Sequence, residues 1–60
     1  MAIWLVKVGA ISPDGYEQIE GLMSVVAPTE QIAWLKARFW LFPWKQPARK
    51  KWAHVMGQQP

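Results

Sequence analysis

The sequence predicts a mainly α fold with minor β structure. We expect two to three short helices in a helix-turn-helix-like arrangement, with a short N-terminal strand and a C-terminal basic wing. Three observations lead to this class: two stretches whose apolar residues recur at helical spacing, proline and glycine residues that bracket them, and a proline-bracketed basic segment. The length of sixty residues predicts a single small domain over residues 1–60, and the absence of cysteine excludes a disulfide framework. Residues 57–60 are expected to form a frayed tail.

The N-terminal segment, residues 2–8, is rich in β-branched and aromatic side chains, which favours a short strand. Alternation places Ile3 and Leu5 on one side of this strand together with Lys7. Because this charge interrupts the apolar side and Gly9 ends the run, a first helical turn is the alternative interpretation.

A first helix is predicted over residues 15–25. The preceding Ser-Pro-Asp-Gly stretch, residues 12–15, fits either a type I turn or a serine N-cap followed by a first-turn proline. Gly21 in the middle of this helix costs about 1 kcal/mol relative to alanine, and Pro28 ends it. The apolar stripe of the helix, at positions i, i+3, i+7 and i+10, comprises Tyr16, Ile19, Met23 and Val26.

A second helix is predicted over about residues 30–41. The hydroxyl of Thr29 is placed to cap its first turn, and Pro43 ends it. Because one small core does not suffice to cover two apolar sides, we expect something outside the monomer to cover part of this helix. The principal stripe comprises Ile32, Leu35, Phe39 and Phe42, and the nearly opposite side comprises Trp34, Ala37 and Leu41.

The C-terminal segment after Pro47 allows two interpretations. One is a short helix over residues 48–56 that ends at Gly57, and the other is a strand over residues 49–55 that returns along residues 42–45.

Charge is divided unevenly along the chain. Residues 1–28 carry a net charge of −2 and residues 29–60 a net charge of +5. An anionic partner should therefore meet the C-terminal half, although a solvated basic face is the plainer explanation. The six cations of this half are Lys36, Arg38, Lys45, Arg49, Lys50 and Lys51.

Residues 27–52 resemble the small winged-helix excisionases and the DNA-binding domains of the MerR type. The matching motifs are Pro28-Thr29, Trp34-Leu35-Lys36, Phe42-Pro43 and Arg49-Lys50-Lys51-Trp52, in that order. The resemblance implies binding of double-stranded DNA, with the second helix in the major groove and cations on phosphates. The residues expected to contact DNA are Thr29, Gln31, Lys36, Arg38, Lys45, Arg49, Lys50 and Lys51. A module this small buries little surface, so we also expect dimeric or cooperative binding.

Tryptophans among cations support other partners as well. Indole rings and basic side chains suit an anionic membrane surface, and Trp and Arg are also preferred anchors of protein interfaces and of self-association. Trp40 and Trp44 form the expected aromatic contact surface, which could also stack single-stranded bases. Three further tryptophans, Trp4, Trp34 and Trp52, are expected to fill the core.

The sequence predicts neither enzymatic activity nor a cofactor or metal site. The single histidine, His54, has no acidic residue within 20 positions, and the four carboxylates are scattered. The N-terminal apolar run is cut short by Lys7 and no apolar stretch is long enough to span a bilayer. Together with the absence of cysteine, these features lead us to expect a cytoplasmic protein.

Overall fold

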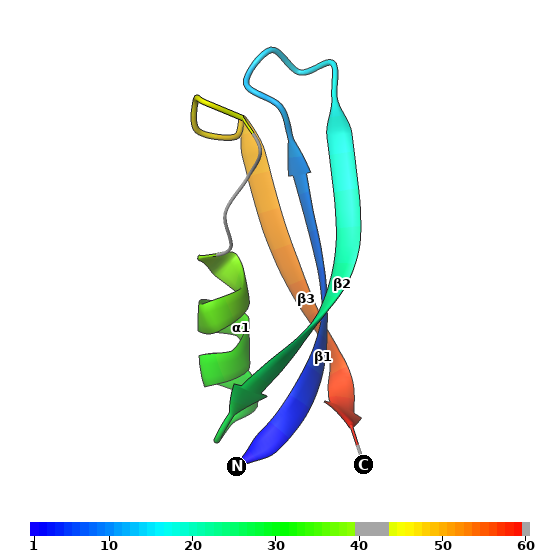
Figure 1. Ribbon diagram of the computed structural model, residues 1–60, viewed down its shortest axis with the longest axis vertical. Coiled ribbons are helices and arrows are strands. Elements are labelled where there is room, and N and C mark those ends of the chain that lie inside the picture. The colour runs from blue at the N-terminus through cyan, green and yellow to red at the C-terminus, as the bar shows by residue number, and fades with distance from the viewer. Residues whose placement is uncertain (40–43, 60) are drawn as a thin grey trace.

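The computed structural model describes residues 1–39 and 44–59, which form one three-stranded antiparallel sheet with one helix packed on it (Figure 1). The elements follow the order β1 (Ala2–Ile11), β2 (Gln18–Ala27), α1 (Glu30–Arg38) and β3 (Lys50–Gln59). β1 lies in the centre of the sheet, between β2 and β3. The predicted mainly α fold is wrong, because strands make up 55% of the described residues and helix only 16%.

β1 confirms the strand interpretation of residues 2–8 and extends it to Ile11. Its alternate residues Val6, Val8 and Ala10 are buried, whereas Lys7 between them is exposed. The charge therefore lies on the face of the sheet that α1 leaves uncovered, and it does not interrupt the core.

β2 replaces the helix predicted over residues 15–25, and this prediction is wrong. The apolar positions of this stretch suit both periods, but Met23, Val25 and Ala27 alternate toward the core. β2 pairs with β1 over ten residues, from Ala2 opposite Ala27 to Ile11 opposite Gln18. This long pairing satisfies the backbone of both strands, an outcome that local helical periodicity does not reveal.

A tight turn connects β1 to β2, as one of the two interpretations of residues 12–15 predicted. The Gly15 amide donates to the Ser12 carbonyl at 2.9 Å, and Gly15 has a φ of +84°, a conformation that favours glycine. The buried Ser12 hydroxyl accepts a hydrogen bond from the Glu17 amide at 2.9 Å and donates to the Asp14 carboxylate.

α1 begins where predicted, with Thr29 as its N-cap. The Thr29 hydroxyl accepts a hydrogen bond from the Ile32 amide at 3.2 Å. The helix ends at Arg38 with Phe39 as C-cap, so it is shorter than predicted. The predicted helical residues 40 and 41, together with Phe42 and Pro43, lie outside the described residues.

The buried side of α1 differs from the predicted one. Ala33 and Ala37 are fully buried against the sheet, whereas Ile32, Leu35 and Phe39 of the predicted principal stripe are exposed. Small side chains allow the helix axis to approach the sheet closely, and the stretch predicted as the first helix is a strand of that sheet. The exposed stripe agrees with the expectation that the monomer covers only one side of this helix.

β3 shows that the helix predicted over residues 48–56 is wrong. The strand interpretation holds, and β3 pairs with β1 and continues through Gln59. Of its predicted partner, residues 42–45, residues 42 and 43 lie outside the described residues, and residues 44 and 45 are not part of a strand. The predicted basic wing is therefore part of the central sheet. Because successive side chains point to opposite faces, Lys51 lies on the α1 side, opposite Ala10, and Lys50 on the other, opposite Ile11.

The core lies between α1 and one face of the sheet. Both chain ends lie at one end of the elongated molecule and the loops around residues 12–17 and 44–49 at the other, with α1 beside the half nearer the termini (Figure 1). The sheet's other face carries no covering layer within the described residues. The core consists of Val6, Val8, Val25, Ala27, Ala33 and Ala37, with Trp4, Met23, Ala53 and Val55 packed against it.

Candidate interaction surfaces

The uncovered face of the sheet, which we call the open face, is unusually apolar. Exposed antiparallel faces normally carry polar side chains in alternation with the buried apolar ones. Here Leu22 is 65% exposed, Val26 51% and Ile3 42%. Strand pairing places Ile3 directly opposite Val26, Leu5 opposite Ser24 in the next row, and Lys7 opposite Leu22 in the row after that. The apolar side chains of the open face are Ile3, Leu5, Ile11, Leu22, Val26 and Trp52.

The charged groups of the open face are mostly basic. Lys7 and His54 are paired neighbours on β1 and β3, Lys50 lies two rows away, and Glu20 is the acid that β2 contributes. A partner that covers this face would have to supply apolar contact in its centre and acidic groups around it.

A second surface, which we call the helix flank, is formed by Leu35, Arg38 and Phe39 of α1 and Lys51 of β3. These residues line a hollow of about 360 Å³. Partial burial lowers the pKa of Lys51, and the nearby Arg38 charge lowers it further. The guanidinium of Arg38 also lies 4.7 Å from the ring centroid of Trp34, within cation–π range. The helix flank thus joins two cations to exposed apolar side chains.

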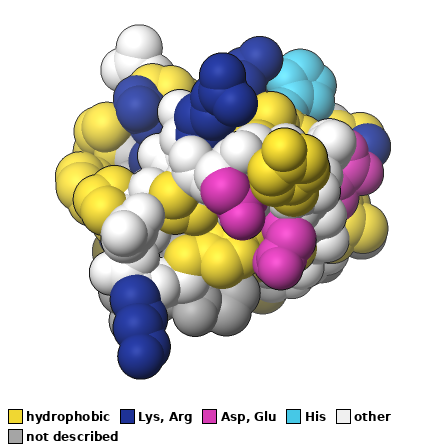
Figure 2. Space-filling view, turned by 90° about the horizontal axis from the view of Figure 1, so that it is seen from above, with side chains coloured by type: hydrophobic (Ala, Val, Ile, Leu, Met, Phe, Trp, Pro, Cys, Tyr) yellow, Lys and Arg dark blue, Asp and Glu magenta, His cyan; other side chains and the backbone are white. Residues whose placement is uncertain are grey.

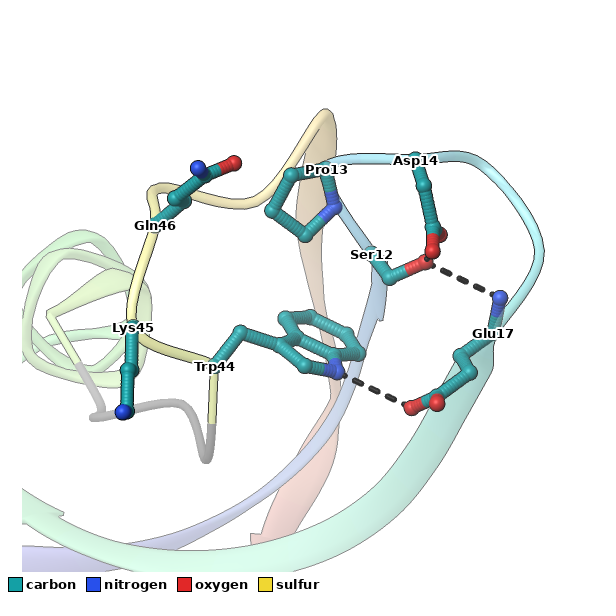
Figure 3. Close-up of a pocket in the computed structure, with 7 residues that line it drawn as sticks. All are labelled: Ser12, Pro13, Asp14, Glu17, Trp44, Lys45 and Gln46. Carbon is teal, nitrogen blue, oxygen red and sulfur yellow. Dashed lines mark hydrogen bonds between the residues drawn. The ribbon is translucent and has the colours of Figure 1, made fainter.

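The end of the molecule that carries the loops contains a pocket of about 400 Å³ between residues 12–17 and residues 44–46 (Figure 3). Trp44 forms one wall, and its indole N–H donates to Glu17 Oε2 at 3.0 Å. Ser12 donates to Asp14, and the Tyr16 amide donates to the same carboxylate, so the pKa of Asp14 is lowered. The Trp44–Glu17 hydrogen bond therefore joins the two loops, whereas the bonds to Asp14 stabilise the first loop internally.

The predicted DNA-contacting cations do not form one patch. Seen from the loop end, Lys and Arg side chains occupy separate places around the rim, with acidic and apolar side chains between them (Figure 2). Lys45 lines the loop-end pocket and Arg49 lies beside Gly15 in the β1–β2 turn. Lys50 belongs to the open face, whereas Arg38 and Lys51 meet on the helix flank.

The remaining predicted contact residues have structural roles or lie at single positions. The Thr29 hydroxyl is engaged as the helix cap, and the Lys36 ammonium group donates to the Val26 carbonyl at 2.9 Å. Gln31 is exposed on the first turn of α1. Trp44 belongs to the loop-end pocket, and its predicted partner Trp40 lies outside the described residues.

The tryptophans expected in the core lie at its edges. Trp4 donates its indole N–H to the Ala27 carbonyl, and Trp34 donates to the Ala53 carbonyl, each at 3.1 Å. Trp52 is half-buried and lies over Gly9 on the open face. The sequence offered one signal for the open face: in a strand over residues 2–8, alternate side chains share a face, which placed Ile3, Leu5 and Lys7 together.

Neither a metal site nor a membrane-spanning helix occurs among residues 1–39 and 44–59. No three His, Asp or Glu side chains in this part of the chain come together as metal ligands. α1, with nine residues, is the helix described there and cannot cross a bilayer.

Comparisons with protein-family models, with curated proteins and with solved structures gave no match. The resemblance to excisionases and MerR-type domains is thus neither supported nor refuted as kinship. The helix-turn-helix and winged-helix arrangements that it implied are absent from the described residues, which hold one helix and a sheet.

Proposed function

We propose that this chain is a non-enzymatic protein-interaction module that binds a partner protein through the open face. The observation that carries this proposal is the exposure of Ile3, Leu22 and Val26 on a sheet that is covered on one side only. A contiguous apolar surface of this kind is the usual mark of a binding site for another protein.

The chemistry of the open face defines the partner. Apolar side chains from β1 and β2 supply the area, and the half-buried Trp52 supplies a rigid aromatic contact. Lys7 and Lys50 favour a partner surface whose apolar centre is bordered by acidic side chains. A cytoplasmic location belongs to this proposal because the chain has no cysteine.

The described residues do not form the helix-turn-helix unit on which the predicted major-groove recognition of DNA depended. The predicted first helix is a strand, Thr29 is engaged as a cap, and the cations expected to contact phosphates lie on separate surfaces. The proposed function therefore does not include duplex recognition.

A second candidate function, docking on an anionic membrane surface, is favoured by the helix flank. Phe39 is 77% exposed and Leu35 44%, and both lie beside Arg38 and Lys51. Apolar and basic side chains in this arrangement suit the boundary between acyl chains and phosphate headgroups.

The test of the main proposal places a photo-crosslinking residue at Leu5, which lies inside the open face. We expect one discrete adduct with another protein in the cells that produce this chain. The adduct should disappear in the double variant Ile3→Thr/Val26→Thr, which preserves β-branching but makes the open face more polar. The matched control is Ile32→Thr, which changes an exposed isoleucine of α1 in the same way and should keep the adduct.

Three outcomes would contradict the main proposal: no adduct, an adduct that survives the double variant, or adducts formed only between copies of this chain. Vesicles of phosphatidylglycerol test the second candidate. Binding to these vesicles that is lost in Phe39→Ser and kept in the open-face double variant would assign the helix flank to a membrane. Failure to bind them would remove this candidate.

A further inference from the structure

The sheet has two edge strands, β2 and β3, which differ in how well their outward backbone groups are protected. β2 and β3 each have one side that is not paired with β1. Free backbone N–H and C=O groups at a sheet edge form a template for pairing with another strand, and proteins usually protect such edges.

The edge of β3 is protected. The Trp34 indole N–H donates to the Ala53 carbonyl, so a side chain of α1 occupies this edge. Lys50 and Lys51 begin the strand, and its pairing with β1 shifts between Leu5 and Val6. Indole, charge and irregular pairing are all devices that discourage strand addition.

The edge of β2 is open over residues 18–24, whereas the Lys36 ammonium group of α1 occupies it at Val26. β2 pairs with β1 over its full length without a shift in register. The Val26 carbonyl points away from β1, since it accepts the Lys36 ammonium group. In an antiparallel strand both backbone groups of a residue point to the same side. Alternation therefore turns the backbone of Gln18, Glu20, Leu22 and Ser24 outward, and no hydrogen bond joins these groups to the rest of the described chain.

We propose that a second copy of this chain pairs with this edge, β2 against β2 in antiparallel orientation, about a two-fold axis at Leu22. Such a contact is self-complementary, because the same strand supplies both sides of the interface. This inference does not rest on the proposed function, which uses the open face and not the edge.

Side chains along β2 favour this register. It places Leu22 beside Leu22 of the second copy, Glu20 beside Ser24, and Gly21 beside Met23, whose long side chain fills the space that a glycine leaves. A shift of the axis to Glu20 would place two carboxylates directly opposite each other, which is unfavourable. The register also gives Gly21 a role, since no atom of residues 1–39 and 44–59 lies within 4 Å of where its Cβ would be.

Charges at the two ends of β2 are complementary in the same register. Val26 lies opposite Gln18 of the second copy, so Lys36, which contacts Val26, comes close to the second copy's Glu17. Both groups lie on the α1 side of the sheet, because the alternation that turns Met23, Val25 and Ala27 toward the core also turns Glu17 to that side. On dimerisation the Lys36 ammonium group leaves the Val26 carbonyl, which then pairs with the second copy, and binds the second copy's Glu17 carboxylate instead. The two-fold symmetry produces this contact twice.

The resulting dimer has one continuous six-stranded sheet. Because directly paired residues point to the same face, the two-fold axis is perpendicular to the sheet. Both copies of α1 then cover one face, and the two open faces join into one surface of twice the width.

Chemical synthesis of this short chain allows a test that leaves every side chain unchanged. Methylation of the Leu22 backbone nitrogen removes an outward N–H and blocks strand addition, while the ladder with β1 stays intact. We expect the unmodified chain to sediment as a dimer and the N-methyl-Leu22 chain as a monomer with the same far-ultraviolet circular dichroism. The matched control is N-methylation of Ala53 on the protected edge of β3, which should leave the dimer intact.

A charge exchange tests the register. Lys36→Glu and Glu17→Lys should each weaken dimerisation roughly three- to tenfold, since each places like charges together at both ends of β2. An equimolar mixture of the two variants restores both contacts and should associate like the original chain. Ile3→Thr on the central strand should leave the dimer intact, which separates this inference from the proposed function.

Three results would overturn the inference: a monomeric unmodified chain at high concentration, a dimer that persists after methylation of Leu22, or a mixture of charge variants that associates no better than either variant by itself.

Discussion

The indole ring of Trp52 on β3 occupies the space in which Gly9 of β1 would carry a side chain. The two residues are direct partners in the antiparallel pairing. A Cβ at Gly9 would collide with three ring atoms of Trp52, so the ring can pack here only because residue 9 is a glycine. The Trp52 ring therefore lies flat against the backbone of β1 on the open face.

Gly9→Ala should lower the free energy of unfolding by about 1–3 kcal/mol, because the added methyl group overpacks a buried contact. Chemical denaturation at low protein concentration measures this. The control is Gly21→Ala, where the added methyl group meets no atom of the described part of the chain. That variant should leave stability unchanged or raise it by up to about 1 kcal/mol. Equal effects of the two substitutions would contradict the packing assigned to Trp52.

Thr29→Ala should destabilise the protein by about 1 kcal/mol, since the Ile32 amide loses its hydrogen-bond acceptor at the start of α1. Thermal unfolding checks this result. Gln31→Ala, an exposed change in the same turn, should stay within about 0.5 kcal/mol of the original chain. If both changes are neutral, the Thr29 cap does not contribute to stability.

Trp34→Phe should cost about 0.5–1.5 kcal/mol, because the Ala53 carbonyl at the edge of β3 loses its donor while most of the ring contact remains. Hydrogen exchange should increase in β3 more than in β2. As a comparison, Phe39→Leu at the highly exposed end of α1 should be close to neutral. Unchanged exchange in β3 would show that the indole does not protect this edge.

Asp14 should stabilise the fold in a pH-dependent manner. Hydrogen bonds from the Ser12 hydroxyl and the Tyr16 amide lower its pKa below the ordinary value of 3.8. A carboxyl whose pKa is lower in the folded state stabilises that state above the ordinary pKa, and this contribution disappears as the pH falls through the folded value. The melting temperature of Asp14→Asn should therefore lie below that of the original chain at pH 7, and the two should converge below about pH 4. A difference that stays constant down to pH 2 would contradict this assignment.

Local signals in the sequence were sufficient for several parts of the fold. β-branched residues in the N-terminal run predicted a strand, and the Ser-Pro-Asp-Gly stretch included the correct turn among its interpretations. Thr29 was correctly predicted as a cap, because a cap depends on a hydroxyl and on amides three residues away. The strand alternative for the C-terminal segment was correct as well, and the structure shows β1 as its pairing partner.

The sequence by itself determined the charge imbalance and the start of α1, since each follows from composition or from residues a few positions apart. Tertiary structure decided the rest. Residues 18–27 carry an apolar pattern that suits helix and strand alike, and pairing with β1 selected the strand. With a sheet in place of a first helix, α1 packs on the sheet through Ala33 and Ala37, and its larger apolar side chains stay exposed. The same pairing separated Lys50 from Lys51, because neighbouring side chains of a strand point to opposite faces.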